Sequence, residues 1–245
     1  MQIVYSESLS IRTSDINPQL YAHPHALIQI MEEVSLQHTL TNKISFKDLS
    51  SVSSSWVLLK KEVEVFRFPQ LNDIVTVTTY PSDIKGFFTY RDYHMSDISG
   101  EKLATISSMW TMMHTGTRKM MRIPDSYTEM LHRTADALTK PEFRIRSFEY
   151  PCFPQYTQVN FLHLDWNGHV NNAEFVKMIF GALPGAFHEQ YRMHRLQIHY
   201  KREAQLGMEL KICNYFLSET SIHHRITDKH SGLEIVLAQS EWNEL

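Results

Sequence analysis

The feature that most constrains the fold of this chain is a faint internal repeat. The segment Ser99–Trp110 returns as Ser231–Trp242, with a Ser-Gly pair at its start and Ser-x-Trp at its end, shifted by 132 positions (231 − 99). Earlier in the chain, Asp15–Asn17 resembles Asp165–Asn167, shifted by 150 positions (165 − 15). Repeated elements in the same order indicate a duplicated structural unit. The sequence therefore predicts two related modules.

Each half shows the same succession of local patterns. Apolar residues at helical spacing predict a helix from about Pro24 to His38, and another after Asn171 that Pro184-Gly185 ends. Alternating apolar and polar residues then predict antiparallel strands. The expected strands are Val57–Val65, Ile74–Thr79, Phe87–Tyr93, Leu103–Met113, Leu196–Tyr200, Met208–Ile212, Ile222–Ile226 and Ile235–Leu237. The predicted fold is α+β, with one long helix against an antiparallel sheet in each half.

A polar segment separates the two predicted modules, which cover residues 1–124 and 151–245. This connector, residues 125–150, contains Pro141 and lacks the runs of Gly and Ser that make a linker flexible. We therefore expect it to be ordered, with a short helix formed by Met130-Leu131 and Ala135–Leu138.

The composition excludes several classes of protein. The net charge of −3 gives no general attraction to nucleic acid, and no apolar run reaches the length of a transmembrane helix. The first residues lack the basic and apolar regions of a signal peptide. Cys152 and Cys213 form no CxxC motif and no disulfide framework, which is typical of a reducing compartment. We expect a cytoplasmic protein without nucleic-acid binding or membrane insertion.

The segment Leu164–Asn172 concentrates groups that can hydrolyse an activated carbonyl. Asp165, Asn167 and His169 alternate, so their side chains would share one face of an extended chain. The helix that follows would add the positive end of its dipole, with amides near Val170 aimed at an oxyanion. A base, a hydrogen-bonding amide and an anion-stabilising helix end suit hydrolysis.

Structural roles for the same residues compete with this interpretation. Asp165 alone could cap a turn, Asn167 beside Gly168 is a typical turn residue, and 14 histidines make any single one uninformative. Asn171 and Asn172 suit a helix cap. A metal site built on His163, Asp165 and His169 has weaker support, because the chain offers no further ligand motif. The absence of a Gly-rich phosphate loop argues against a nucleotide-binding enzyme.

The segment Leu164–Asn172 resembles the Asp-x-Asn-x-His-Val-Asn-Asn signature of the acyl-acyl-carrier-protein thioesterases, the tandem hotdog enzymes of plants and bacteria. Further similar segments are Leu9–Arg12, Trp110–Met113 with Thr117-Arg118 and Ile123-Pro124, and His199–Glu203. The resemblance spans nearly the whole chain. It implies two hotdog modules, a catalytically silent one at 1–124 that shapes the acyl-chain pocket and a catalytic one at 151–245.

The resemblance also implies roles for four residues. Asp165 is the expected base or nucleophile, Asn167 holds the carbonyl or positions water, and His169 orients the nucleophile or protonates the leaving thiolate. Glu203 is expected to polarise water or support the aspartate. Plant enzymes carry a cysteine directly after this glutamate, whereas this chain has Ala204. A thiol nucleophile is therefore not expected.

The predicted function is hydrolysis of fatty acyl-acyl-carrier-protein to free fatty acid, with acyl carrier protein as the partner and without a cofactor or metal. Basic candidates for docking that acidic carrier are Arg118, Lys119, Arg122, Lys201 and Arg202. An acyl-CoA thioesterase of the same fold is the first alternative, and a non-catalytic acyl-thioester-binding module is the second. The sequence leaves open whether the chain is a monomer or a homodimer.

Overall fold

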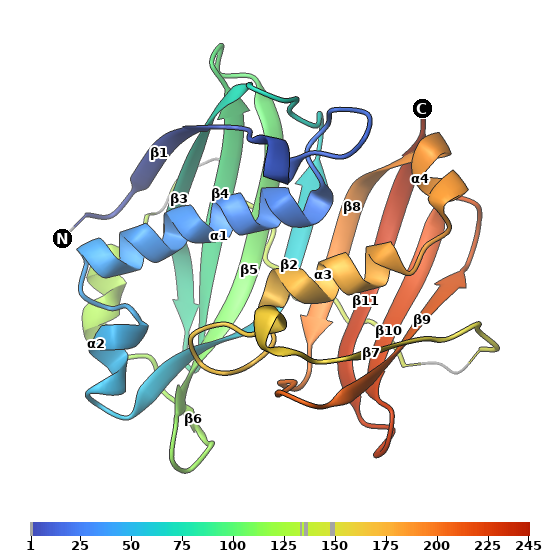
Figure 1. Ribbon diagram of the computed structural model, residues 1–245. Helices are drawn as coiled ribbons and strands as arrows, with labels where there is room; N and C mark the ends of the chain where they lie inside the picture. The colour runs from blue at the N-terminus through green and yellow to red at the C-terminus, as the bar shows by residue number, and fades with distance from the viewer. Residues whose placement is uncertain (1, 133, 135–136, 148–149) are drawn as a thin grey trace. The chain divides into compact units, whose positions relative to one another are not determined.

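The computed structural model describes residues 2–132, 134, 137–147 and 150–245. The chain divides into two compact units, Met1–Glu142 and Phe143–Leu245. Each unit contains one long helix lying across an antiparallel sheet (Figure 1). The predicted α+β architecture is confirmed. No helix in the described part of the chain is long and apolar enough to span a lipid bilayer.

The first unit is built on a five-stranded antiparallel sheet with an added short strand. Its order is β1 (Tyr5–Ser10), β3 (Ile74–Lys85), β4 (Phe88–Asp97), β5 (Lys102–His114) and β2 (Ser54–Val65), with β6 (Met120–Met121) pairing with β5. Helix α1 (Pro24–Thr41) buries Leu27, Met31 and Val34, which recur at helical spacing. The remaining short elements are η1 (Thr13–Asp15), α2 (Phe46–Ser50) and η2 (Asp125–Met130).

The second unit repeats this order of elements. Its sheet runs β7 (Gln155–Gln158), β9 (Glu209–Phe216), β10 (Ser221–Asp228), β11 (Glu234–Glu244) and β8 (Tyr191–Tyr200). Helix α3 (Asn172–Gly181) follows η3 (Phe161–His163), and Asn171 caps it by accepting a hydrogen bond from the Ala173 N–H at 2.9 Å. The Pro184-Gly185 pair, predicted to end this helix, instead begins a further short helix, α4 (Gly185–Gln190).

Matching hydrogen bonds support the shift of 132 positions between the late parts of the two units. The indole N–H of Trp110 donates to Ser108 Oγ at 2.8 Å, and that of Trp242 donates to Ser240 Oγ at 2.6 Å. Both pairs lie on the last long strand of their unit. The two sequence echoes therefore occupy equivalent places in the fold.

The end of the first unit is attached to its own sheet by polar contacts. The Leu138 N–H donates to Asp92 Oδ2 at 2.9 Å, and Lys140 pairs with Asp83. The predicted short helix is only partly matched, because η2 ends at Met130 and Ala135–Asp136 lies outside the described residues.

The two cysteines are joined in a disulfide, which corrects the expectation that they are unpaired. Cys152 precedes β7 and Cys213 lies on β9, with their Cα atoms 5.9 Å apart. Their separation of 61 positions in the sequence gave no sign of this proximity. The fold creates it by pairing β7 with β9.

Candidate active site

The segment that carries Asp165, Asn167 and His169 is a tight turn, so the expectation of an extended strand is wrong. Leu164 and Val170 form an isolated antiparallel bridge, and the chain reverses between them. The Asp165 N–H donates to the His169 carbonyl at 2.8 Å. Gly168 adopts φ +74°, a left-handed conformation that glycine reaches without steric cost. The Asn-Gly pair therefore acts as a turn signal, and side-chain alternation does not set the site.

The two oxygens of the Asp165 carboxylate have different roles. Its Oδ1 atom accepts the N–H groups of Asn167 at 2.8 Å and His169 at 3.3 Å. Its Oδ2 atom makes no hydrogen bond with the described residues. One oxygen thus holds the turn while the other can meet water or substrate.

His169 and Glu203 form the second part of the site. His169 Nε2 lies 3.2 Å from Glu203 Oε2, and the two side chains are 22% and 27% exposed. A bridge between His169 and Gln205 brings the loop after β8 to this turn. Because Nε2 faces a carboxylate, it carries the ring hydrogen. The other ring nitrogen, Nδ1, makes no hydrogen bond within the described part of the chain.

The backbone amide expected to face an oxyanion is not the one available. The Val170 N–H donates to the Ala204 carbonyl at 2.9 Å, so the expectation for this amide is wrong. Asn172, the first residue of α3, has an N–H without a hydrogen-bond acceptor among the described residues. An unsatisfied amide in the first helical turn can bind an anion.

Asn167 lies on the same turn but is not joined to the other candidates through its side chain. Its side chain is exposed and makes no hydrogen bond with the residues that the structure describes. Hydrogen bonds and the His169–Glu203 contact thus connect Asp165, His169 and Glu203. Within the described residues, no group of three or more acidic, histidine or cysteine side chains could hold a metal ion.

The first unit contains the same turn with different residues. Asn17 Oδ1 accepts the N–H groups of Gln19 at 3.0 Å and Tyr21 at 3.1 Å, and Ile16 forms a bridge with Ala22. Asn17 is therefore the equivalent of Asp165, which corrects the shift of 150 positions to 148 (165 − 17) and the pairing with Asp15. The other equivalent pairs are Gln19 and Asn167, Tyr21 and His169, Pro24 and Asn172, and Phe68 and Glu203.

These substitutions remove each candidate chemical group from the first turn. Asn17 lacks a carboxylate, Tyr21 lacks an imidazole and Phe68 lacks an acid. Pro24 begins α1 and has no N–H, so the amide offered by Asn172 has no counterpart. Sequence inspection missed this correspondence because the echo in residue types was two positions out of register.

The second unit also contains a pocket, which does not coincide with the turn that carries Asp165. It has a volume of about 530 Å³ and is lined by residues that include Cys152, Ala182, Pro184 and Tyr215. Ala182 and Pro184 follow the C-terminal end of α3, whereas the turn with Asp165 precedes its N-terminal end. Ten helical residues span about 15 Å, so this pocket is separate from the candidate site.

Comparisons with known proteins identify the family. Residues 2–131 match the acyl-ACP thioesterase N-terminal domain, and residues 152–244 match the acyl-ACP thioesterase C-terminal domain. The chain belongs to the acyl-ACP thioesterase family. It is 26% identical over 262 residues to the acyl-[acyl-carrier-protein] hydrolase FATB3, chloroplastic, of Cuphea viscosissima, covering 98% of this chain and 62% of that protein.

Another curated relative is also similar over nearly the whole chain. The dodecanoyl-[acyl-carrier-protein] hydrolase, chloroplastic, of Umbellularia californica is 24% identical over 258 residues, covering 98% of this chain and 68% of that protein. The chain spans 62%, 60% and 63% of the length of the first curated relatives that it matches.

Solved structures of thioesterases share the fold. The 12:0-ACP thioesterase from Umbellularia californica superposes with a TM-score of 0.91 at 22% identity, covering 100% of this chain and 99% of that chain. The putative oleoyl thioesterase from Lactobacillus plantarum gives 0.88 at 24% identity, with 99% and 96% covered. The tandem hotdog fold implied by the sequence resemblance is thereby confirmed.

Proposed function

We propose that the chain hydrolyses fatty acyl thioesters carried on acyl carrier protein, releasing a free fatty acid and the carrier with its thiol. The observation that carries this proposal is the turn in which Asp165 keeps Oδ2 available and accepts, at Oδ1, the backbone N–H of His169, whose ring contacts Glu203. Family membership supports the choice of substrate, because its relatives are named as hydrolases of acyl carrier protein esters.

The proposed mechanism gives each group one task. Asp165 Oδ2 either takes a proton from the attacking water or attacks the thioester carbonyl itself, forming an acyl-aspartyl anhydride that water then cleaves. The amide of Asn172 and the side chain of Asn167 stabilise the oxyanion. His169, oriented by Glu203, accepts the proton released by water at Nδ1, directly or from Asp165, and passes it to the leaving thiolate. The C–S bond breaks, and water supplies the oxygen of the acid and the hydrogen of the thiol.

We further propose that the first unit is catalytically silent and shapes the acyl-chain pocket. The silent role is supported by the residues of the first unit that are equivalent to the catalytic candidates. They lack the chemical groups of Asp165, His169, Asn172 and Glu203. An ion pair lies among the polar contacts between α1 and the sheet of this unit, because the fully buried Lys61 on β2 pairs with Glu32 on α1. An acyl chain between α1 and the sheet would have to stop before this ion pair, since displacing it leaves buried charges without partners.

The test is thiol release by the purified protein from matched acyl-carrier-protein and acyl-CoA substrates of several chain lengths. Asp165→Asn should lower kcat by at least about 100-fold. Asn17→Asp, the reciprocal change in the equivalent turn, is the matched control and should leave kcat unchanged. A preference for the CoA ester would favour the acyl-CoA thioesterase alternative. Tight binding of both substrates without turnover would favour the alternative of a non-catalytic acyl-thioester-binding module.

The proposal also covers the cellular location and the oligomeric state of the protein. We infer a cytoplasmic location from the presence of only two cysteines in the chain. Disulfides are rare in that compartment, so we expect the Cys152–Cys213 bridge to form only on oxidation of the isolated protein, and both cysteines should be alkylated as free thiols in freshly lysed cells. Sedimentation equilibrium of the purified protein would distinguish a monomer from a homodimer.

A further inference from the structure

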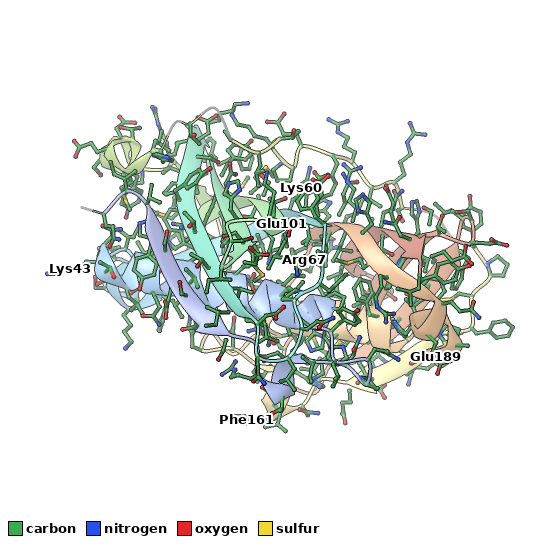
Figure 2. The ribbon with its side chains drawn as sticks, turned by 90° about the horizontal axis from the view of Figure 1, so that it is seen from above. Lys43, Lys60, Arg67, Glu101, Phe161 and Glu189 are labelled. Carbon is green, nitrogen blue, oxygen red and sulfur yellow. A yellow bond between two sulfur atoms is a disulfide. The ribbon has the colours of Figure 1, made fainter. Side chains whose placement is uncertain are left out.

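Large apolar side chains face solvent around the candidate active site. We call these four residues the apolar rim: Phe161 is 77% exposed, Leu162 87%, Trp166 56% and Leu206 60%. Figure 2 shows Phe161 at the lower margin of the view. Clustered exposed apolar side chains are unfavourable in water and commonly mark an interaction surface.

The backbone holds the apolar rim next to the proposed catalytic groups. Trp166 directly follows Asp165 in the turn, and Leu206 directly follows Gln205, which bridges to His169. The Gly207 N–H donates to the Val159 carbonyl at 2.9 Å, which brings the loop with Leu206 beside the segment that leads into Phe161 and Leu162. Any partner that covers the rim therefore sits over the site.

The fold does not require these apolar residues, as the equivalent turn in the first unit shows. With the shift of 148 positions, Phe161 corresponds to Thr13, Leu162 to Ser14 and Trp166 to Pro18, all exposed. The first turn keeps the same backbone hydrogen bonds with these small or polar residues. Phe161, Leu162 and Trp166 are thus particular to the unit that carries the catalytic candidates, whereas Leu206 corresponds to another leucine, Leu71.

The charge next to the rim also differs between the two units. Arg202, which precedes Glu203, is exposed and donates to the carbonyl oxygen of Glu234 at 3.0 Å, with no carboxylate of the described residues in ion-pair distance. Its equivalent, Arg67, pairs with Asp97 and Glu101. The second unit therefore presents an uncompensated cation beside its rim.

We propose that the apolar rim and Arg202 form the docking surface for the acidic acyl carrier protein, an inference that rests on the proposed function. The thioester arrives on a flexible arm, so its carrier must bind near the groups that cleave it. Exposed aromatic side chains and an arginine are enriched in protein interfaces, and a cation steers an acidic partner. An anionic lipid surface fits less well, because such binding takes several basic residues together and Lys201 is already paired with Glu234.

The test compares kcat/KM for an acyl carrier protein substrate with kcat/KM for the same acyl group on free pantetheine. The first variant is the double substitution Phe161→Thr with Leu162→Ser, which introduces the residues found at these positions in the first unit. The second variant, Arg202→Gln, removes the positive charge. Each should lower the ratio of the two constants about 30-fold, the size of the loss that marks an interface hot spot. Phe153→Thr, a fully exposed phenylalanine away from the rim, is the matched control and should leave the ratio unchanged.

The outcomes separate the two proposals. Hydrolysis by the wild-type protein with an unchanged ratio in both rim variants would overturn the docking surface and leave the proposed function intact. If the ratio is unchanged in the variants but they no longer bind phosphatidylglycerol vesicles, the rim binds a lipid surface instead of the carrier protein. Failure of the wild-type protein to hydrolyse either substrate would overturn both proposals.

Discussion

His169 Nε2 lies 3.2 Å from Glu203 Oε2, although the two residues belong to segments on opposite sides of α3 in the sequence. The contact directs the ring hydrogen of His169 to the carboxylate and leaves Nδ1 available. It defines a role for Glu203 that a single glutamate at the end of a strand does not suggest.

Replacing Glu203 by Gln should lower kcat about 10- to 100-fold while preserving the fold, because an amide orients His169 but cannot stabilise its protonated form. The measurement is steady-state hydrolysis of an acyl carrier protein substrate, with thermal unfolding as the check on folding. Glu209→Gln is the control, since Glu209 pairs with Lys229 and His230 instead. Equal activity of the two variants would contradict the role assigned to Glu203.

Gly168→Ala should destabilise the protein by about 1 to 2 kcal/mol, because an alanine is unfavourable at φ +74°. A Cβ at this position meets no atom within 4 Å, so the cost comes from the backbone alone. Gly185 offers equal space without a left-handed conformation, and Gly185→Ala should instead stabilise by about 0.5 kcal/mol. Denaturant unfolding of both variants provides the measurement, and equal shifts would contradict the assigned turn geometry.

Two buried histidines should make the protein less stable in mild acid. Burial lowers the pKa of His224 to about 3, and burial together with the Arg91 guanidinium lowers the pKa of His38 to about 4. Arg91 donates to His38 Nδ1 at 3.0 Å, so this nitrogen must remain unprotonated.

Both pKa values lie below the unfolded value of 6.5, so the unfolded chain binds more protons as the pH falls below 6.5. Each histidine should therefore remove about 2 kcal/mol of stability between pH 8 and pH 5. Urea unfolding at the two pH values tests this. A free energy of unfolding that stays constant over this range would contradict the burial of both rings in neutral form.

Reduction of the Cys152–Cys213 disulfide should lower the free energy of unfolding. The bridge spans 61 positions, and closing a loop of that length removes unfolded-state entropy worth at most about 4 kcal/mol. Thiol titration establishes the oxidised state, and denaturant unfolding with and without reductant gives the difference. A Cys152→Ser variant with the stability of the oxidised protein would show that the bridge contributes nothing.

The double variant Lys61→Met with Glu32→Leu should shift the preference of the enzyme toward longer acyl chains, if the first unit shapes the proposed pocket. Replacing a buried ion pair by apolar side chains of similar size is often tolerated, so the fold should survive. The measurement is the ratio of kcat/KM values across a series of chain lengths. An unchanged profile in a stably folded double variant would contradict this role for the pair.

Residue patterns along the chain were enough to predict the two longest helices, the long strands and the duplication of the fold. Apolar spacing predicted α1, α3 and the long strands, because amphipathic periodicity depends on neighbouring residues. The motif that contains Asp165, Asn167 and His169 was also recognisable from its residue types. Only the tertiary structure placed Glu203 against His169, joined Cys152 to Cys213, and matched Asp165 with Asn17. These relations depend on hydrogen bonds and contacts between segments far apart in the chain, and local residue patterns carry no information on such distances.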